Sequence, residues 1–313
     1  MKEHFLDFER PIAEIIEKIE ALQVASNEDP ELLGQIEKLR KEEEKLKNKI
    51  FSKLSTWQKV QVARHPQRPH TSDYIKAVFS DFIELHGDRQ FADDQSIIGG
   101  IAEIEGNSVM VIGHEKGRET EDKVKRNFGM PQPEGYRKAK RLMQLAERFN
   151  LPVITFIDTA GAYPGIEGEE RGQSEAIATN LAVMSKLRTP IIVIITGEGG
   201  SGGALAIGVG DYIAILEHAT YSVASPEACA SIIWRTAEKA SDAAEAMKVS
   251  AQELIKIKIV DEIIKEPLGG AHRDYKEISE SVRSCILKNL GTLLSKPIDD
   301  LLEARYKKLL EIG

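Results

Sequence analysis

The sequence predicts an α/β protein with a layered or spiral sheet, preceded by a helical hairpin. Three observations lead to this fold class. Short β-branched runs alternate with segments of helical periodicity, some expected strands follow one another directly, and residues 1–54 carry helical periodicity only. Of the 313 residues, 42% are hydrophobic, so the chain can bury a large core and does not have the composition of a disordered protein.

Residues 1–54 differ in composition from the rest and predict two amphipathic helices. Apolar residues recur at spacings of three and four in a first run of Phe8, Ile12, Ile15, Ile16, Ile19 and Leu22. A turn at residues 27–30 precedes a second run of Leu33, Ile36, Leu39, Leu46, Ile50 and Leu54. Because each helix has one apolar stripe, we expect that the hairpin cannot bury itself alone. It should lie on the main body or on a partner chain.

From residue 72 onward, expected helices and strands alternate. The first half predicts a helix over 72–85, paired strands over 97–104 and 108–112, a basic helix over 134–149, a strand over 153–157, a helix over 171–187 and a central strand over 190–196. The second half predicts strands over 212–216 and 221–224, helices near 226–235 and 240–256, a strand over 259–264 and a helical region over about 272–310. Alternation with intervening strand pairs implies the layered or spiral sheet.

Charge and cysteine content narrow the function classes. A net charge of −8 argues against general nucleic-acid binding. Cys229 and Cys285, the two cysteines, cannot form a disulfide scaffold or a four-thiolate zinc site, so we expect reduced thiols and no bound metal. The longest apolar runs, such as 191–195, are far shorter than the roughly 18 residues of a membrane span, and the acidic start is unlike a signal peptide. The sequence therefore predicts a cytoplasmic protein.

The sharpest local feature is the glycine-rich segment GEGGSGG at residues 197–203, which follows the central strand. Glycines allow backbone N–H groups to approach a ligand, because no Cβ stands in the way. A helix that begins directly after such a segment also directs its free N–H groups at the ligand. The segment therefore predicts a site for an anion, or for an oxygen that becomes negatively charged.

Two familiar patterns fit this segment, and each has a difficulty. Gly197, Gly199 and Gly202 fit G-x-G-x-x-G, with Glu217 as a ribose-binding acid, but too few residues follow for a crossover helix. Ser201 fits G-x-S-x-G, a nucleophile elbow, which requires a histidine base. His218 and His272 are the available bases, and His218 follows Ser201 too closely for an α/β-hydrolase.

A third interpretation makes the peptide N–H groups themselves the catalytic device. Gly202 and Gly203 are the natural pair for an oxyanion hole, which is often the largest single contribution to acyl chemistry. The alternative is that the glycines only allow tight helix–strand packing. A second glycine-containing turn, DTAGAYPG at residues 158–165, also follows a buried strand. Both turns should therefore face the same edge of the sheet, where α/β folds bind ligands.

At these residues the chain resembles the family of bacterial acetyl-coenzyme A carboxylase carboxyltransferase alpha subunits. The resemblance covers nearly the whole chain and rests on segments 63–69, 92–94, 113–120, 127–131, 133–138, 169–176, 225–227 and 267–273, together with the two glycine turns. One departure is Ala160, which stands where the family usually has proline before the Gly-Ala-Tyr-Pro-Gly turn.

The resemblance implies a crotonase-like (ClpP/crotonase) spiral of ββα units over residues 55–313, with C-terminal helices, after a hairpin over 1–54. It implies an alpha2beta2 heterotetramer with a zinc-ribbon beta subunit that binds acetyl-CoA. The reaction would move carboxylate from carboxybiotin, on the biotin carboxyl carrier protein, to acetyl-CoA. The product would be malonyl-CoA for fatty acid biosynthesis, with ATP used by the biotin carboxylase component. Alternatives are another acyl-CoA carboxyltransferase subunit or a non-catalytic assembly subunit.

The resemblance also implies site residues. Gly202 and Gly203 amides would stabilise charge on the ureido oxygen of biotin. The biotin pocket would be lined by Gly161, Ala162, Tyr163, Gly199 and Gly200, although Tyr163 could equally be a core aromatic residue. A basic tract is interpreted as a solvated face or as an attraction surface for an acidic carrier protein or CoA phosphates; it contains Lys116, Arg118, Lys123, Lys125, Arg126, Arg137, Lys138, Lys140 and Arg141. His65, His70 and His114 lack metal-ligand spacing and are expected to be structural.

Overall fold

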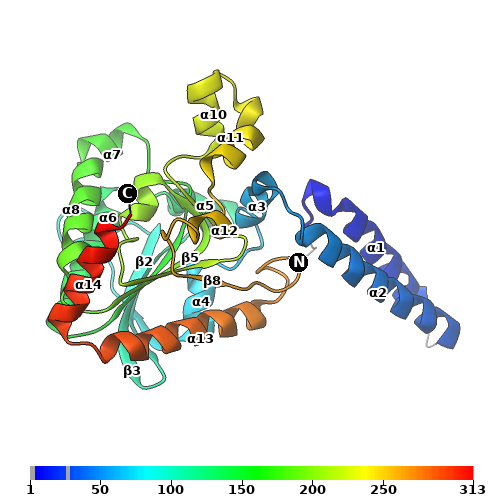
Figure 1. The fold of residues 1–313 in the computed structure, drawn as a ribbon, viewed down its shortest axis with the longest axis horizontal. Helices are drawn as coiled ribbons and strands as arrows, with labels where there is room; N and C mark the ends of the chain where they lie inside the picture. Colours follow the sequence, from blue (N-terminus) through cyan, green and yellow to red (C-terminus); the bar gives the residue numbers. More distant parts are fainter. Residues whose placement is uncertain (1–3, 26–28, 313) are drawn as a thin grey trace.

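The structure is a computed structural model that describes residues 4–25 and 29–312. A central twisted sheet is surrounded by helices, and two helical pairs extend from this body (Figure 1). One pair is the N-terminal hairpin, α1 (Arg10–Ala25) and α2 (Pro30–Phe51), and the other is the arm formed by α10 (Pro226–Trp234) and α11 (Ala240–Met247).

The N-terminal hairpin buries much of its apolar surface between its own helices. Ile15, Ile19 and Ile36 form a buried cluster along the hairpin. At the base, Ile12 and Phe51 pack with residues of the body in a second cluster. The expectation that the hairpin could not bury itself alone is therefore wrong for its outer half, because the two apolar stripes face each other.

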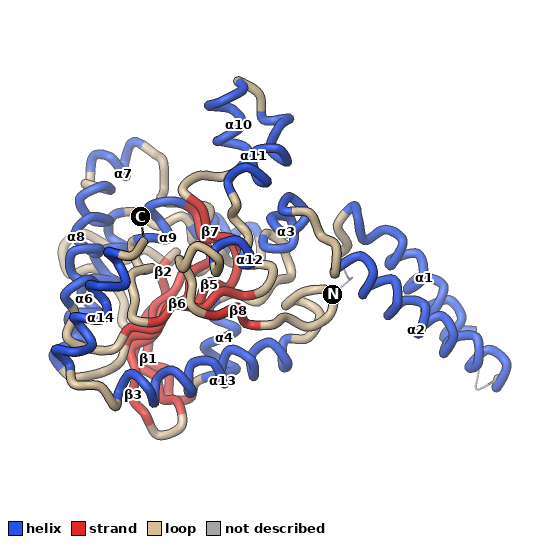
Figure 2. Tube along the Cα trace, in the orientation of Figure 1, coloured by secondary structure: helices blue, strands red, loops and turns tan. Residues whose placement is uncertain are grey.

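The sheet lies at the centre of the body (Figure 2). Its strands are β1 (Ser80–Glu84), β2 (Ile97–Ile104), β3 (Asn107–His114), β4 (Val153–Thr159), β5 (Ile191–Gly200), β6 (Tyr212–Leu216), β7 (Thr220–Ser222) and β8 (Glu262–Ile264). The strand order is β1-β2-β3-β4-β5-β6-β8, with β7 paired to the end of β5. The pairs β1·β2 and β2·β3 are antiparallel, and the later pairs are parallel. The parallel strands direct their carboxyl ends to one edge, where the glycine segments lie.

Helices cover the sheet and complete the core. Besides the hairpin and the arm, the α-helices are α3 (Thr56–Ala63), α4 (Thr71–Val78), α5 (Thr120–Lys125), α6 (Pro133–Arg148), α7 (Ile166–Glu170), α8 (Gln173–Lys186), α9 (Ser201–Leu205), α12 (Ala251–Leu254), α13 (Tyr275–Leu294) and α14 (Ile298–Leu310). Short 3-10 turns lie at η1 (Asp7–Glu9), η2 (Asn127–Gly129) and η3 (Ala237–Lys239). Buried side chains of β3, β4 and β5 form the centre of the main apolar cluster, as their β-branched composition predicts.

The structure differs from four of the expected elements. The predicted helix over 72–85 ends at Val78, because residues 80–84 pair with β2 as the edge strand β1. The predicted helices over 240–256 and 272–310 are each divided, at Lys248, whose φ is 54°, and at Pro297. The central strand continues beyond residue 196 to Gly200, because residues 198–200 pair with β7. Part of the glycine segment is therefore strand and not loop.

Part of the basic tract is interior, which corrects its interpretation as a solvated or partner-attracting face. Arg137 is 8% exposed and donates from Nε to Asp88 at 2.8 Å. Lys138 is 1% exposed, and its Nζ lies 2.6 Å from Asp93 Oδ1 and 2.8 Å from the Asp94 carbonyl oxygen. Both cations of α6 therefore fasten the loop after β1 to the body.

Candidate active site

The carboxyl ends of β4 and β5 are joined by a buried carboxylate. Asp158, near the end of β4, accepts a hydrogen bond at 3.0 Å from the Glu198 N–H of β5. Lys116 Nζ lies 2.5 Å from the same carboxylate. A Cβ at Gly197 would overlap the Asp158 carboxylate, so only glycine fits at this position. Asp158 therefore fixes the relative position of the two strands from which the glycine turns begin.

The two glycine turns touch each other, as their shared sheet edge predicts. A Cβ at Gly203 would lie 2.5 Å from the Gly161 carbonyl carbon and 2.6 Å from the Ala162 nitrogen. A Cβ at Gly200 would overlap the Ala160 carbonyl. Real Cβ atoms do not approach backbone this closely, so the absence of side chains is what lets the turns meet.

Helix α9 begins directly at this contact. The first amides of a helix have no acceptor within it, which leaves the Ser201, Gly202 and Gly203 N–H groups available to other acceptors. Ser201 has a φ of 51°, in the left-handed region that is unfavourable for a residue with a side chain. The chain therefore changes direction sharply where the strand becomes the helix.

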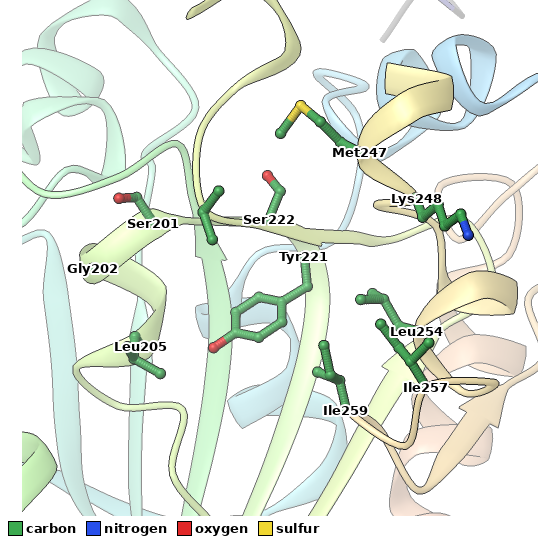
Figure 3. Close-up of a pocket in the computed structure, with 11 residues that line it drawn as sticks. Ser201, Gly202, Leu205, Tyr221, Ser222, Met247, Lys248, Leu254, Ile257 and Ile259 are labelled. Atoms are coloured by element: carbon green, nitrogen blue, oxygen red, sulfur yellow. The ribbon is translucent and has the colours of Figure 1, made fainter. Parts of the chain in front are cut away.

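A cavity of about 480 Å³ opens beside the turn (Figure 3). Ser201 and Gly202 line one part of it, and in the view of Figure 3 the Tyr221 ring stands between Leu205 and Ile259. The remaining lining residues are Ser222, Val223, Met247, Lys248, Leu254 and Ile257. Burial raises the pKa of Tyr221 to about 12, so its phenol stays protonated at neutral pH. The cavity is a largely apolar space, and Ser201 and Gly202, the first two residues of α9, line one part of it.

The residues expected to line a biotin pocket do not line this cavity. Gly199 and Gly200 are buried in β5, with Gly199 against the Tyr221 ring and Gly200 against Ala160. Gly161 and Ala162 lie against Gly203, on a side of the turn that the cavity lining does not include.

Tyr163 is half-buried in the neighbouring turn and is held by its backbone. Its N–H donates to the Pro131 carbonyl at 3.0 Å. Gln173 Nε2 donates to the Pro131 carbonyl at 2.8 Å and to the Tyr163 carbonyl at 3.1 Å. The second glycine turn is therefore braced from α8, and the structure brings Gly161, Ala162, Gly202 and Gly203 together around one contact.

The structure contradicts the two alternative interpretations of the glycine segment, as a dinucleotide-binding loop and as a nucleophile elbow. Helix α9 has only five residues, and β5 and β6 are adjacent parallel strands, so the long crossover helix of a dinucleotide-binding unit is absent between them. Ser201 Oγ has no hydrogen-bond partner among the described residues. Of its two candidate bases, His218 packs against Phe51 and His272 stacks on His65. A Ser–His pair is therefore not formed.

The remaining polar candidates have structural partners. His65 and His114 are buried, and burial lowers the pKa of each to about 4. His70 is 7% exposed and faces Glu115. In the described ranges, no group of three or more His, Cys, Asp or Glu side chains could hold a metal ion. Cys229 and Cys285 are free thiols, and no helix in the same ranges is long and apolar enough to cross a bilayer.

Sequence reasoning missed the groups that hold the turn in place. Arg64, from the end of α3, bonds both Glu198 of β5 at 2.9 Å and Glu227 of α10 at 2.6 Å. Asp158 belongs to the sequence segment DTAGAYPG, which its glycines made conspicuous, and the structure places it near the end of β4. Its position directly after the expected strand over 153–157 is the sequence signal for its role. For Arg64, no neighbouring strand or glycine turn in the sequence indicates its role at the site. The same holds for the residues of 247–259 that line the cavity, because both segments are distant in sequence from the glycine turns.

The fold, with its paired glycine turns at the carboxyl ends of parallel strands, is that of the crotonase-fold carboxyltransferases. Transcarboxylase 12S, solved with methylmalonyl-coenzyme A and methylmalonic acid bound, superposes with a TM-score of 0.61 at 18% identity over 74% of this chain and 42% of that chain. A Pseudomonas malonate decarboxylase hetero-tetramer in complex with coenzyme A gives 0.59 at 18% identity, over 74% and 90% of the two chains.

Sequence comparison defines the family. The family described as "Acetyl co-enzyme A carboxylase carboxyltransferase-like" matches residues 5–313. The acetyl-coenzyme A carboxylase carboxyl transferase subunit alpha of Vibrio cholerae is 59% identical over 317 residues, covering 100% of this chain and 99% of that protein. The subunit of the same name from Pseudomonas aeruginosa is 58% identical over 314 residues, with the same coverage. The chain belongs to this family of carboxyltransferase alpha subunits.

Proposed function

We propose that this chain is the alpha subunit of a biotin-dependent carboxyltransferase that forms malonyl-CoA from acetyl-CoA, the first committed step of fatty acid biosynthesis. The observation that carries this proposal is the glycine turn at Gly202 and Gly203, which begins a helix beside a cavity. In the described part of the chain, Ser201 at this turn is not paired with a histidine base. The 59% identity to an alpha subunit over the whole of this chain supports acetyl-CoA as the acceptor and malonyl-CoA as the product. The carboxyl donor would be carboxybiotin on the biotin carboxyl carrier protein.

The residues present fit a biotin ring. Gly202 lines the cavity and has no Cβ, so at this residue the turn presents backbone and no side-chain bulk to the cavity. Biotin supplies the carboxyl group and, once that group has left, a basic nitrogen. The Gly202 and Gly203 N–H groups would donate to the ureido oxygen as negative charge develops there. Such donors typically contribute about 10²–10³-fold in rate.

The two carboxylates that the described structure places beside the turn, Asp158 and Glu198, are not free to act as a general base. Asp158 is paired with Lys116, and Glu198 is paired with Arg64 at 2.5 Å. Both carboxylates are buried and already accept hydrogen bonds from neighbouring groups. The chain's own contribution is therefore to bind, orient and stabilise charge through backbone amides.

A partner subunit would complete the site. This chain matches only 42% of the transcarboxylase chain, whose remainder has no counterpart here. Around the cavity, Val223 is 84% exposed, Ile257 52% and Leu205 40%, which is a concentration of apolar surface typical of an interface. We propose that a zinc-ribbon beta subunit covers this surface and holds acetyl-CoA, in an alpha2beta2 assembly. The carrier protein would bring carboxybiotin to this assembly, and a biotin carboxylase that uses ATP would form the carboxybiotin. Because both cysteines are free thiols, the proposed compartment is the cytoplasm.

The test is carboxyl transfer from malonyl-CoA to a free biotin analogue, with the purified chain alone and with the beta subunit. We expect transfer only with both chains, and a mass of the mixed complex that corresponds to two copies of each. Full activity of this chain alone would overturn the proposal. Propionyl-CoA in place of acetyl-CoA in the forward direction distinguishes a carboxyltransferase for another acyl group.

A further inference from the structure

His114 reaches the glycine turn from a strand that is not its neighbour. It is the last residue of β3, which is separated from β5 by β4. The side chain is 1% exposed, and its Nε2 lies 3.2 Å from the Gly203 carbonyl oxygen. The His114 carbonyl accepts a hydrogen bond at 2.5 Å from Thr71 Oγ1 of α4, which fixes the backbone that carries the ring.

The Gly203 carbonyl needs this donor because α9 ends too early to satisfy it. The Ala206 N–H donates to the Gly202 carbonyl at 3.0 Å, as in a regular helix. The next amide, that of Ile207, donates instead to the Ala204 carbonyl at 3.4 Å. The hydrogen bonds of the helix therefore leave the buried Gly203 carbonyl without a backbone donor. A buried carbonyl without any donor would lower the stability of the fold by about 1–3 kcal/mol.

The bond also fixes the tautomer of the ring. A carbonyl oxygen can only accept, so Nε2 must carry the hydrogen. Burial, only partly offset by the charge of Asp158, lowers the pKa of His114 to about 4. The ring is therefore neutral at neutral pH, with its single hydrogen on Nε2.

Two consecutive glycines have more backbone freedom than any other pair, so contacts must hold their peptide planes. The Gly161 and Ala162 backbone limits Gly203 on one side. We propose that His114 holds it on the other, as a positioning residue. Its bond to the Gly203 carbonyl fixes the Gly203–Ala204 peptide, and a fixed peptide on this side of Gly203 limits the rotation of the adjoining Gly202–Gly203 peptide, which carries the Gly203 N–H. This inference rests on the proposed carboxyl-transfer function of the Gly202 and Gly203 amides.

The test compares two variants in the complex with the beta subunit. His114→Phe keeps the ring volume but removes the donor, and His114→Gln keeps an N–H at a similar reach. We expect His114→Phe to lower kcat by about tenfold or more, with KM for malonyl-CoA changed less than about twofold, because misdirected amides affect the transition state most. His114→Gln should recover most of the lost kcat. Wild-type kcat in His114→Phe, or equal losses in both variants, would overturn the inference.

A second buried histidine provides the matched control. His65 is 2% exposed and stacks on His272 at 3.7 Å, away from the glycine turn. His65→Gln should lower thermal stability but keep kcat within about twofold, since it does not contact the turn. If His65→Gln lowers kcat as much as His114→Phe does, the effect is general loosening of the body and the positioning role is refuted.

A measurement on the full chain alone keeps the inference testable if a variant fails to assemble. The ¹⁵N-histidine spectrum at pH 7 should contain a neutral Nε2–H ring that disappears in His114→Gln. An Nδ1–H ring at that position would overturn the inference. This readout needs no activity, so it separates failure of the positioning role from failure of the proposed function, which would appear as an inactive wild-type complex.

Discussion

A single methyl group at residue 203 should disable the site, although it removes no hydrogen-bond donor. In Gly203→Ala the new Cβ would lie 2.5 Å from the Gly161 carbonyl carbon and 2.6 Å from the Ala162 nitrogen. Ordinary van der Waals contact begins near 3.4 Å. Both of these atoms belong to the backbone, so no flexible side chain can move aside to make room for the Cβ. The two turns must therefore separate.

The separation needed is about 1 Å, which is the difference between the built and the ordinary contact distance. A misplacement of that size commonly costs about 10²-fold in rate, and overpacking costs about 1–3 kcal/mol of stability. We therefore expect kcat to fall about 10²-fold in Gly203→Ala while the chain remains folded. The same change at Gly202 places a Cβ 3.5 Å from Ile177 Cδ1, an ordinary contact.

The assay is carboxyl transfer from malonyl-CoA to a free biotin analogue by the reconstituted complex, with urea denaturation of the chain as the measure of stability. Gly203→Ala should lose at least about tenfold more kcat than Gly202→Ala. Gly291→Ala, in α13 with nothing within 4 Å of its Cβ, controls for the general effect of replacing glycine and should slightly raise stability. Equal kcat for Gly203→Ala and wild type would refute the reasoning and favour a purely structural role for the glycines, as in an assembly subunit.

Three further predictions concern Arg305, three buried histidines and Ser201. Arg305, whose side chain is fully buried, donates to both Asp211 oxygens at 2.9 and 2.7 Å, so Arg305→Ala should cost about 3–5 kcal/mol in urea unfolding, and a loss under 1 kcal/mol would contradict this. Burial lowers the pKa values of His65, His114 and His272, to about 4, 4 and 2. Because these rings bind protons more readily in the unfolded chain, they do not reduce the free energy of unfolding above pH 6.5. As the pH drops toward 4, that free energy should fall by up to about 1.4 kcal/mol per pH unit for each ring. Equal free energies of unfolding at pH 7 and pH 5 would contradict this. Ser201→Ala should leave carboxyl transfer within about threefold of wild type, because Ser201 Oγ has no partner base in the described chain, whereas a loss above about 10²-fold would indicate a serine nucleophile.

Much of the secondary structure could be predicted from local pattern. The strands over 153–157 and 212–216 and the helix over 134–149 match β4, β6 and α6 within two residues at each end, because their periodicity and their burial agree. The edge strand β1 could not be predicted. Residues 80–84 lie exposed or half-buried, so their pattern carries no strand period, and pairing with β2 decides their conformation.

The site was predictable only as two separate turns. Glycine content marked residues 158–165 and 197–203, because close backbone approach requires glycine wherever it occurs. The extension of β5 to Gly200 depends on pairing with β7, which lies some twenty residues further along the chain. The partners Lys116 and Arg64 come from other elements altogether.

By itself the sequence determined the alternation of strands and helices, the helical hairpin, the glycines at two strand ends and the family to which the chain belongs. These are properties of neighbouring residues, or of motifs read in order. Only the tertiary structure decided that Gly203 rests on Gly161, that His114 bonds the Gly203 carbonyl, and that Arg137 and Lys138 are interior. The physical reason is that sheet register and helix packing bring together residues 34 to 89 positions apart, as in the pairs Arg137–Arg171 and His114–Gly203, and no local pattern encodes which distant segments will meet.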